Sequence, residues 1–173
     1  LHAAVQLLNP GFELRAVETE SRSVADWAVV NADRRSSGGV FPVHSGFGSL
    51  QIYMGGSAYQ TFTVDTSGET WSLSGYAKNI SMTQAQDAYG QLEIIFKDGS
   101  GTTLDTLVSS PFTPVADTDW IAASVSGLSP AGTKQVQVGF EVLDAGGGGG
   151  SLYFDDMVLV APVPEPVNAA LGL

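Results

Sequence analysis

The sequence predicts an all-β fold, an antiparallel β-sandwich of the jelly-roll type. Three observations indicate this fold: apolar and polar residues alternate along several short runs, turn-forming residues separate the runs, and no segment carries the apolar stripe of an amphipathic helix. Alternation places successive side chains on opposite faces of a sheet, so each run has one face for a core and one for water. Many short strands of this kind pack as two stacked sheets.

The strands are predicted in chain order from these runs and from the turns that end them. The alternating runs are 61–64, 71–78, 92–97 and 136–142, and residues 153–157 form a last strand-like run. Gly, Pro, Asp and Ser residues that favour chain reversal stand between them, in the turns 65–68, 98–101, 129–132 and 146–150. We expect these apolar members of the runs to face the core: Phe62, Val64, Trp71, Leu73, Leu92, Ile94, Phe96, Val136, Val138 and Phe140.

Composition favours one folded domain and excludes several classes of partner. The chain has 173 residues, of which 43% are apolar and 14% charged, enough for a single core over residues 5–161. The net charge of −11 would repel a nucleic acid, and the only basic cluster is Arg34-Arg35. Without cysteine, the chain forms no disulfide and no thiolate metal site. No apolar run reaches the roughly 20 residues of a membrane span, so we expect no membrane contact of this chain.

Two acidic motifs lie near opposite ends of the predicted domain. Asn-Pro-Gly-Phe-Glu ends at Glu13, and Tyr-Phe-Asp-Asp-Met contains Asp155 and Asp156. Acids so far apart would meet if they shared a hard cation, because Ca²⁺ binds several carboxylate and carbonyl oxygens. Strand alternation lets only one of the aspartates face inward, and we favour Asp155, because Tyr153 and Met157 would share its face. The alternative is that Glu13 is a strand-end acid and the aspartates form a solvated pair.

The order of short motifs along the chain resembles that of bacterial carbohydrate-binding modules of the galactose-binding-like jelly-roll type, as found beside xylanases and other glycanases. The motifs are Leu8 to Glu13, Ala25-Asp26-Trp27, His44 to Leu50, Tyr59 to Phe62, Trp71 to Lys78, Asp119-Trp120, Ser129 to Thr133 and Tyr153 to Met157. The resemblance implies a structural Ca²⁺ site. Its acidic ligands would be Glu13 and Asp155 or Asp156. Its backbone oxygens would come from near Gly11 and from the loop 44–48, where His44 and Phe47 are the candidates.

Sugar recognition needs exposed aromatic rings beside polar side chains that bond hydroxyl groups. Alternation places such side chains on the outward faces of the predicted strands. The candidates are Tyr53, Tyr59, Tyr76, Gln51, Lys78, Glu93, Gln137 and Glu141. We expect a non-catalytic module that binds a polysaccharide or surface glycan. The alternative function is a cell-surface or biofilm-matrix structural or adhesion protein. No convergent acid and base can be named for an enzyme.

The C-terminal tail has a recognisable sequence of its own. Val163-Pro164-Glu165-Pro166, followed by the apolar start Val167 to Leu173, resembles the PEP-CTERM sorting signal, which exosortases of some Gram-negative bacteria process. We therefore expect residues 162–173 to be a Pro-rich tail with a truncated signal, and residues 1–4 to be a leader remnant. The full-length protein would be secreted, and sorted at the cell envelope or in the extracellular matrix.

Overall fold

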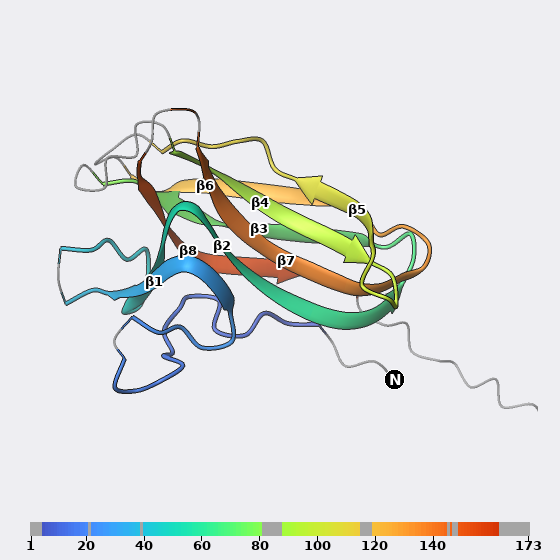
Figure 1. Cartoon of the computed structure of the whole chain (residues 1–173), viewed down its shortest axis with the longest axis horizontal. Helices are drawn as coiled ribbons and strands as arrows, with labels where there is room; N and C mark the ends of the chain where they lie inside the picture. The colour runs from blue at the N-terminus through green and yellow to red at the C-terminus, as the bar shows by residue number, and fades with distance from the viewer. Residues whose placement is uncertain are drawn as a thin grey trace, which may run out of the picture.

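The computed structural model describes residues 5–20, 22–38, 40–80, 88–114, 119–144, 146 and 149–162, and its secondary structure is entirely β (Figure 1). The all-β prediction is confirmed. In this part of the chain no helix has the length and apolarity that crossing a membrane requires. The predictions for the leader 1–4 and for the sorting signal 163–173 lie outside the described residues.

All the strand pairings described are antiparallel. The strands are β1 (Ala28–Ser36), β2 (Gly48–Thr66), β3 (Thr70–Lys78), β4 (Ala88–Lys97), β5 (Thr103–Val108), β6 (Ile121–Leu128), β7 (Thr133–Asp144) and β8 (Ser151–Val160). The predicted runs fall within β2, β3, β4, β7 and β8. Glycines with positive φ, at Gly68, Gly101 and Gly132, make three of the predicted turns.

The long strand β2 joins two stacked layers. The strand order is β5-β4-β7-β2-β8-β3-β6, with β1 paired to β2. Residues 56–66 of β2 pair with β7, whereas residues 50–53 pair with β8. One layer therefore contains β5, β4, β7 and the second half of β2, and the other contains the first half of β2, β8, β3 and β6 (Figure 1). Each layer has one inner and one outer face.

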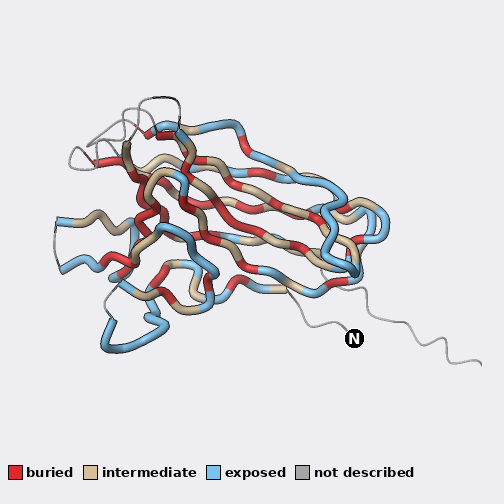
Figure 2. The backbone as a smooth tube through the Cα atoms, in the orientation of Figure 1, coloured by how far each residue is buried: buried red, intermediate tan, exposed pale blue. Residues whose placement is uncertain are grey.

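The core lies between the layers, and alternation fills it as expected. Nine of the ten side chains predicted to face the core are buried, and Phe62 is partly buried against them. Figure 2 shows buried and more exposed residues alternating along the strands. Near one end of the sandwich, the rings of Phe12, Trp27, Phe140 and Phe154 pack in sequence, with centroids 4.4 to 6.0 Å apart. This aromatic cluster holds the N-terminal segment onto the sandwich.

Candidate functional site

The N-terminal segment 9–13 is tied to the rest of the fold by its own polar groups. The Asn9 side chain accepts a hydrogen bond from the backbone N of Leu14 at 2.9 Å and donates one to its carbonyl oxygen at 3.1 Å. Trp27 Nε1 donates to the carbonyl oxygen of Asn9 at 3.0 Å. The backbone N of Met157 donates to the carbonyl oxygen of Pro10 at 3.0 Å, which joins this segment to β8.

Three acidic side chains converge beside Gly11. A Cβ atom added to Gly11 would lie 3.5 Å from Asp156 Oδ1, 3.7 Å from Asp155 Oδ1 and 3.8 Å from Cγ of Glu13. These are ordinary contact distances, so the three side chains all approach the same side of Gly11. We call Glu13, Asp155 and Asp156 the acidic site. The structure brings together acids that lie far apart in the sequence: Glu13 precedes Asp155 by 142 positions and Asp156 by 143.

Asp155 is the buried member of the acidic site, with an exposed fraction of 0%. Its Oδ2 accepts hydrogen bonds from the backbone N of His44 at 2.8 Å and of Ser45 at 3.2 Å, and its Oδ1 accepts one from the backbone N of Asp156 at 2.8 Å. Burial raises the pKa of Asp155 to about 6, and the three backbone N–H groups oppose that rise. The buried charge is therefore only partly compensated, a situation that a nearby cation would relieve.

The prediction that alternation lets only one of the two aspartates face this site is wrong. The pairing of β3 with β8 shifts register between Ser74 and Tyr76, and Asp156 has a φ of 49°, so a bulge interrupts the alternation of β8. Asp156 Oδ2 consequently lies 2.6 Å from His44 Nδ1, on the same segment that Asp155 contacts. After the bulge, Met157 turns into the core instead of sharing the face of Asp155.

Glu13 binds the backbone of the loop before β2. Both of its carboxylate oxygens accept hydrogen bonds from the backbone N of Phe47 at 3.0 Å, and Oε1 also accepts one from Gly48 at 3.2 Å. The carbonyl oxygens of Phe12 and Glu13 accept hydrogen bonds from the buried guanidinium of Arg34, at 2.6 and 2.9 Å. In the sequence Arg34 stood out only as part of the basic cluster Arg34-Arg35, because no local pattern shows that an arginine anchors a distant backbone.

The chemistry of the acidic site fits a hard cation. Three carboxylates supply oxygens, and Ca²⁺ takes six to eight oxygen ligands. Within the described ranges, no three acidic or histidine side chains already stand in coordinating geometry, because the carboxylates are turned toward N–H and O–H donors of the segment 44–48. Binding an ion here would therefore require these side chains to exchange some of their present hydrogen bonds for contacts with the ion.

The outer face of the β4–β7 layer, which we call the β4–β7 face, carries four of the predicted sugar-binding residues. Tyr59, Gly139 and Glu93 lie opposite one another on β2, β7 and β4. A Cβ at Gly139 would lie 2.5 Å from Cδ1 of Tyr59, so the tyrosine ring lies across the glycine, and its hydroxyl donates to Glu93 Oε2 at 2.7 Å. Gln137 and Glu141 flank Gly139 along the same strand. An aromatic ring and three polar side chains thus share one half-exposed surface.

Two carboxyl groups meet on the β4–β7 face. Burial raises the pKa of Glu141 above its ordinary value of 4.5, and the charge and side-chain hydrogen bond of Glu93 raise it further. Burial and the hydrogen bond to Glu93 also raise the pKa of Tyr59. Glu141 therefore keeps its proton to a higher pH than an ordinary glutamate does.

Replacing Glu141 by Gln should change how stability depends on pH. An acid with a raised pKa in the folded state costs stability as pH rises from its ordinary pKa through the raised value, because the unfolded chain ionises first. The difference in melting temperature between E141Q and the wild type should therefore grow in favour of E141Q as pH rises across this acidic window. The difference should persist at neutral pH. Thermal melts at a series of pH values measure it. The exposed Glu18→Gln variant, which removes one equal charge, should show no such gain.

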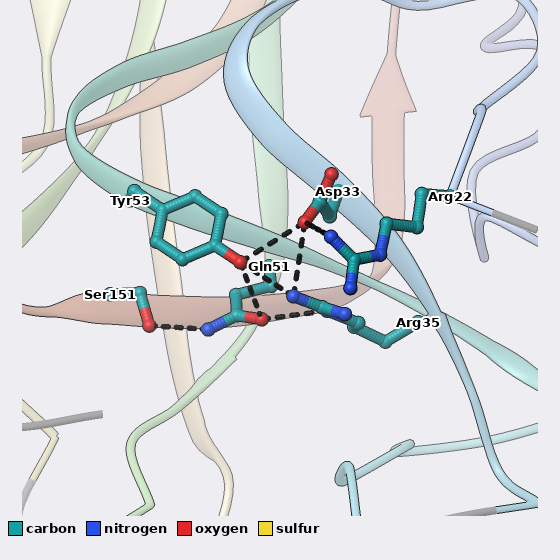
Figure 3. Close-up of polar contacts among 6 residues, drawn as sticks. All are labelled: Arg22, Asp33, Arg35, Gln51, Tyr53 and Ser151. Carbon is teal, nitrogen blue, oxygen red and sulfur yellow. Dashed lines mark hydrogen bonds and ion pairs between the residues drawn. The ribbon is translucent and has the colours of Figure 1, made fainter. Parts of the chain in front are cut away.

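Gln51 and Tyr53 lie on the opposite side of the sandwich, on the outer face of the β8–β3 layer, within a polar network (Figure 3). Gln51 is buried; it accepts a hydrogen bond from Arg35 Nε at 2.7 Å and donates one to Ser151 Oγ at 2.7 Å. The Tyr53 hydroxyl accepts a hydrogen bond from Arg35 Nη2 at 2.5 Å and donates to Asp33 at 3.0 Å. These side chains fasten β1, β2 and β8 to one another, and their polar atoms are already engaged.

Tyr76 and Lys78 lie on the same outer face as Tyr53. The ring of His44 stacks on Tyr76, with centroids 3.9 Å apart, and meets Trp120 edge-on at 5.5 Å. Lys78 lies opposite Tyr153 on β8. The structure thus separates the predicted tyrosines: Tyr59 occupies one outer face, whereas Tyr53 and Tyr76 occupy the other, where Tyr76 stacks on His44.

Comparison with known proteins identifies the fold. No protein-family model matches the sequence, and no curated protein matches it significantly. Among solved structures, the xylan-binding CBM22-1 domain of Xyn10C from Paenibacillus barcinonensis superposes with a TM-score of 0.62 at 20% identity, covering 92% of this chain and 96% of that domain. The chain has the fold of β-sandwich carbohydrate-binding modules.

Two further structures agree over nearly their whole length. TmCBM61, solved in complex with β-1,4-galactotriose, gives a TM-score of 0.58 at 14% identity and covers 92% of this chain and 100% of that one. A family 16 carbohydrate-binding module gives 0.56 at 19% identity, covering 90% and 99%. The chain also spans 21% of the enzymatically active domain of bacteriophage CBA120 tailspike protein 4, with a TM-score of 0.57 at 15% identity and 84% of this chain covered.

Proposed function

We propose that this protein is a non-catalytic carbohydrate-binding module that holds a glycan on the β4–β7 face. The observation that carries the proposal is the ring of Tyr59, which lies across Gly139 beside the carboxyl groups of Glu93 and Glu141. A tyrosine ring covers the apolar face of a pyranose, and carboxylates and amides bond its hydroxyl groups. Gln137 supplies the amide.

The acid pair on this face suits binding better than hydrolysis. Glycoside hydrolysis places its two carboxyl groups about 5 Å apart or more, on either side of the scissile bond. Glu93 and Glu141 instead lie together on one face of the sheet, close enough for Glu93 to raise the pKa of Glu141. The same pair, in a chain of net charge −11, would repel uronic acids and sulfated sugars. We therefore propose a neutral polysaccharide as the ligand.

The test is titration of the purified chain with neutral xylo-, gluco- and galacto-oligosaccharides and with the matching polysaccharides. An acidic polysaccharide tests the expected repulsion of charged glycans. Binding should appear for at least one neutral glycan. Tyr59→Ala should weaken it roughly tenfold or more, because stacking on one aromatic ring is lost. The matched variant Tyr76→Ala removes the same ring type from the opposite face and should bind as the wild type does.

A chain that binds none of these neutral glycans contradicts the proposal. So does an affinity that depends on Tyr76 and not on Tyr59, because the glycan would then lie on the other outer face. Melting curves of both variants separate lost binding from lost folding.

We further propose that the acidic site binds a structural Ca²⁺, held by Glu13, Asp155 and Asp156 with backbone oxygens near Gly11 and in the loop of His44 and Phe47. The support is the convergence of three acidic side chains beside a residue without a side chain. The ion would neutralise the buried Asp155 and join the N-terminal segment to β8. Secretion, with sorting at the envelope of a Gram-negative cell, remains part of the same proposal and is supported by the Val-Pro-Glu-Pro sequence.

A further inference from the structure

The outer face of the β8–β3 layer has an uncharged half. Beyond the segment 41–47, which covers the end near Tyr76, the outward side chains of the three strands are small or aliphatic. We call Ser72, Ser74, Ser124, Ser126, Val158 and Val160 the serine–valine face. Ser124 and Ser126 are exposed, and Val158 and Val160 are 53% and 61% exposed.

The serine–valine face consists of a ridge and a trough. On β8, Val158 lies opposite Ser74 and Val160 lies opposite Ser72. On β6, Ser124 and Ser126 lie opposite the same two β3 serines. The two valines therefore form a ridge along one side, next to two columns of small serine side chains. If a second copy were turned about a two-fold axis parallel to the strands, the ridge of one copy would lie over the trough of the other.

The serine–valine face differs in charge from the β4–β7 face and from the edge strands β1 and β5. With a net charge of −11, two copies repel each other wherever carboxylates meet. The β4–β7 face carries Glu93 and Glu141, and the edge strands β1 and β5 carry Asp33 and Asp105. The serine–valine face has no charged residue, and β6, the strand at its border, has none along its whole length.

We infer that the serine–valine face is the surface through which two copies of this chain associate, sheet against sheet. Burial of the exposed valines and of Leu128, which is 60% exposed, drives the contact, and small serines permit close approach of the two sheets. The serine–valine face comprises six residues, whereas a stable dimer buries roughly 20–30 residues on each partner, so the dimer is weak and dissociates on dilution.

If the proposed function is correct, the dimer would bind two glycans at once. The β4–β7 face lies on the opposite side of the sandwich from the serine–valine face (Figure 1). A dimer formed in this way presents its two β4–β7 faces outward in opposite directions. It would therefore cross-link two polysaccharide chains, which a monomer with one glycan face does not do.

The experiment is sedimentation velocity of the full chain from low micromolar to millimolar concentration. The wild type should shift from monomer to dimer, and added salt should strengthen the dimer by screening the repulsion. Val160→Glu should weaken association roughly tenfold or more, because it places a charge in the contact. The control Val30→Glu changes a valine of matching exposure, 62%, on β1, and should associate as the wild type does.

A monomer at every concentration, open-ended assemblies, or equal association of V160E and wild type would each overturn the inference. Melting curves confirm that V160E is folded. With a bound soluble polysaccharide, turbidity should develop with the wild type and not with V160E, although both bind equally per site. If neither variant binds any glycan, the proposed function fails, whereas the sedimentation result still decides the dimer.

Discussion

Replacing Asp155 by Ala should lower the free energy of unfolding by about 2–4 kcal/mol, a large effect for a single polar substitution. The side chain is fully buried and accepts three backbone hydrogen bonds, from His44, Ser45 and Asp156. Alanine would leave those donors without partners in a place where water has little access. Urea or guanidinium unfolding at pH 8 with a chelator present measures the loss without any contribution from metal.

Asp98 provides the matched control for this substitution. Its Oδ1 also accepts hydrogen bonds from two backbone N–H groups, those of Ser100 and Thr102, but it lies in a solvated hairpin turn. Asp98→Ala should therefore cost much less, since water replaces the lost acceptor. Equal losses for D155A and D98A would contradict the role assigned to burial. Asp155→Asn should fall between the wild type and D155A, because the amide retains one acceptor oxygen.

Removing Ca²⁺ should lower the melting temperature if the proposed metal site is correct. A ligand that binds only the folded state stabilises it by about 2.7 kcal/mol at a hundredfold excess over its dissociation constant. For a domain of this size that corresponds to a shift of roughly 5–10 °C. Melting curves with excess chelator, and then with added Ca²⁺, measure the difference.

Two comparisons make the calcium prediction specific. Glu13→Ala should remove the Ca²⁺-induced shift, because it deletes one of the three converging carboxylates. Mg²⁺ at the same concentration should give a smaller shift, since it demands tighter octahedral geometry and dehydrates reluctantly. Identical melting curves with chelator and with Ca²⁺ would contradict the proposed calcium site.

Periodicity in the sequence predicted runs within five of the eight described strands and their inner faces, whereas β1, β5 and β6 were not predicted. Every second residue of a run such as 92–97 meets the core because successive side chains of a strand point to opposite faces. The same rule failed at Asp155 and Asp156. A bulge adds one residue to β8 and reverses the alternation beyond it, and at the bulge Asp156 contacts His44 and Ser45 of the distant segment 44–48.

Alternation also could not say which tyrosines would share a surface. Tyr53 and Tyr59 both point outward from β2, yet they belong to opposite faces of the sandwich, because the strand passes from one layer to the other between them. For the same reason, the sequence could not show that the ring of Tyr59 lies across Gly139. A glycine in a strand becomes informative only when the neighbouring strand places a ring across it.

The sequence by itself determined the fold class, the core positions and the kinds of side chain available for binding, because these depend on local spacing and composition. The tertiary structure decided which of those side chains meet: the acids beside Gly11, Tyr59 with Glu93 and Glu141, and the uncharged serines beside Val158 and Val160. The reason is that a period of two specifies a side of the strand, whereas strand order, register and bulges specify the neighbour.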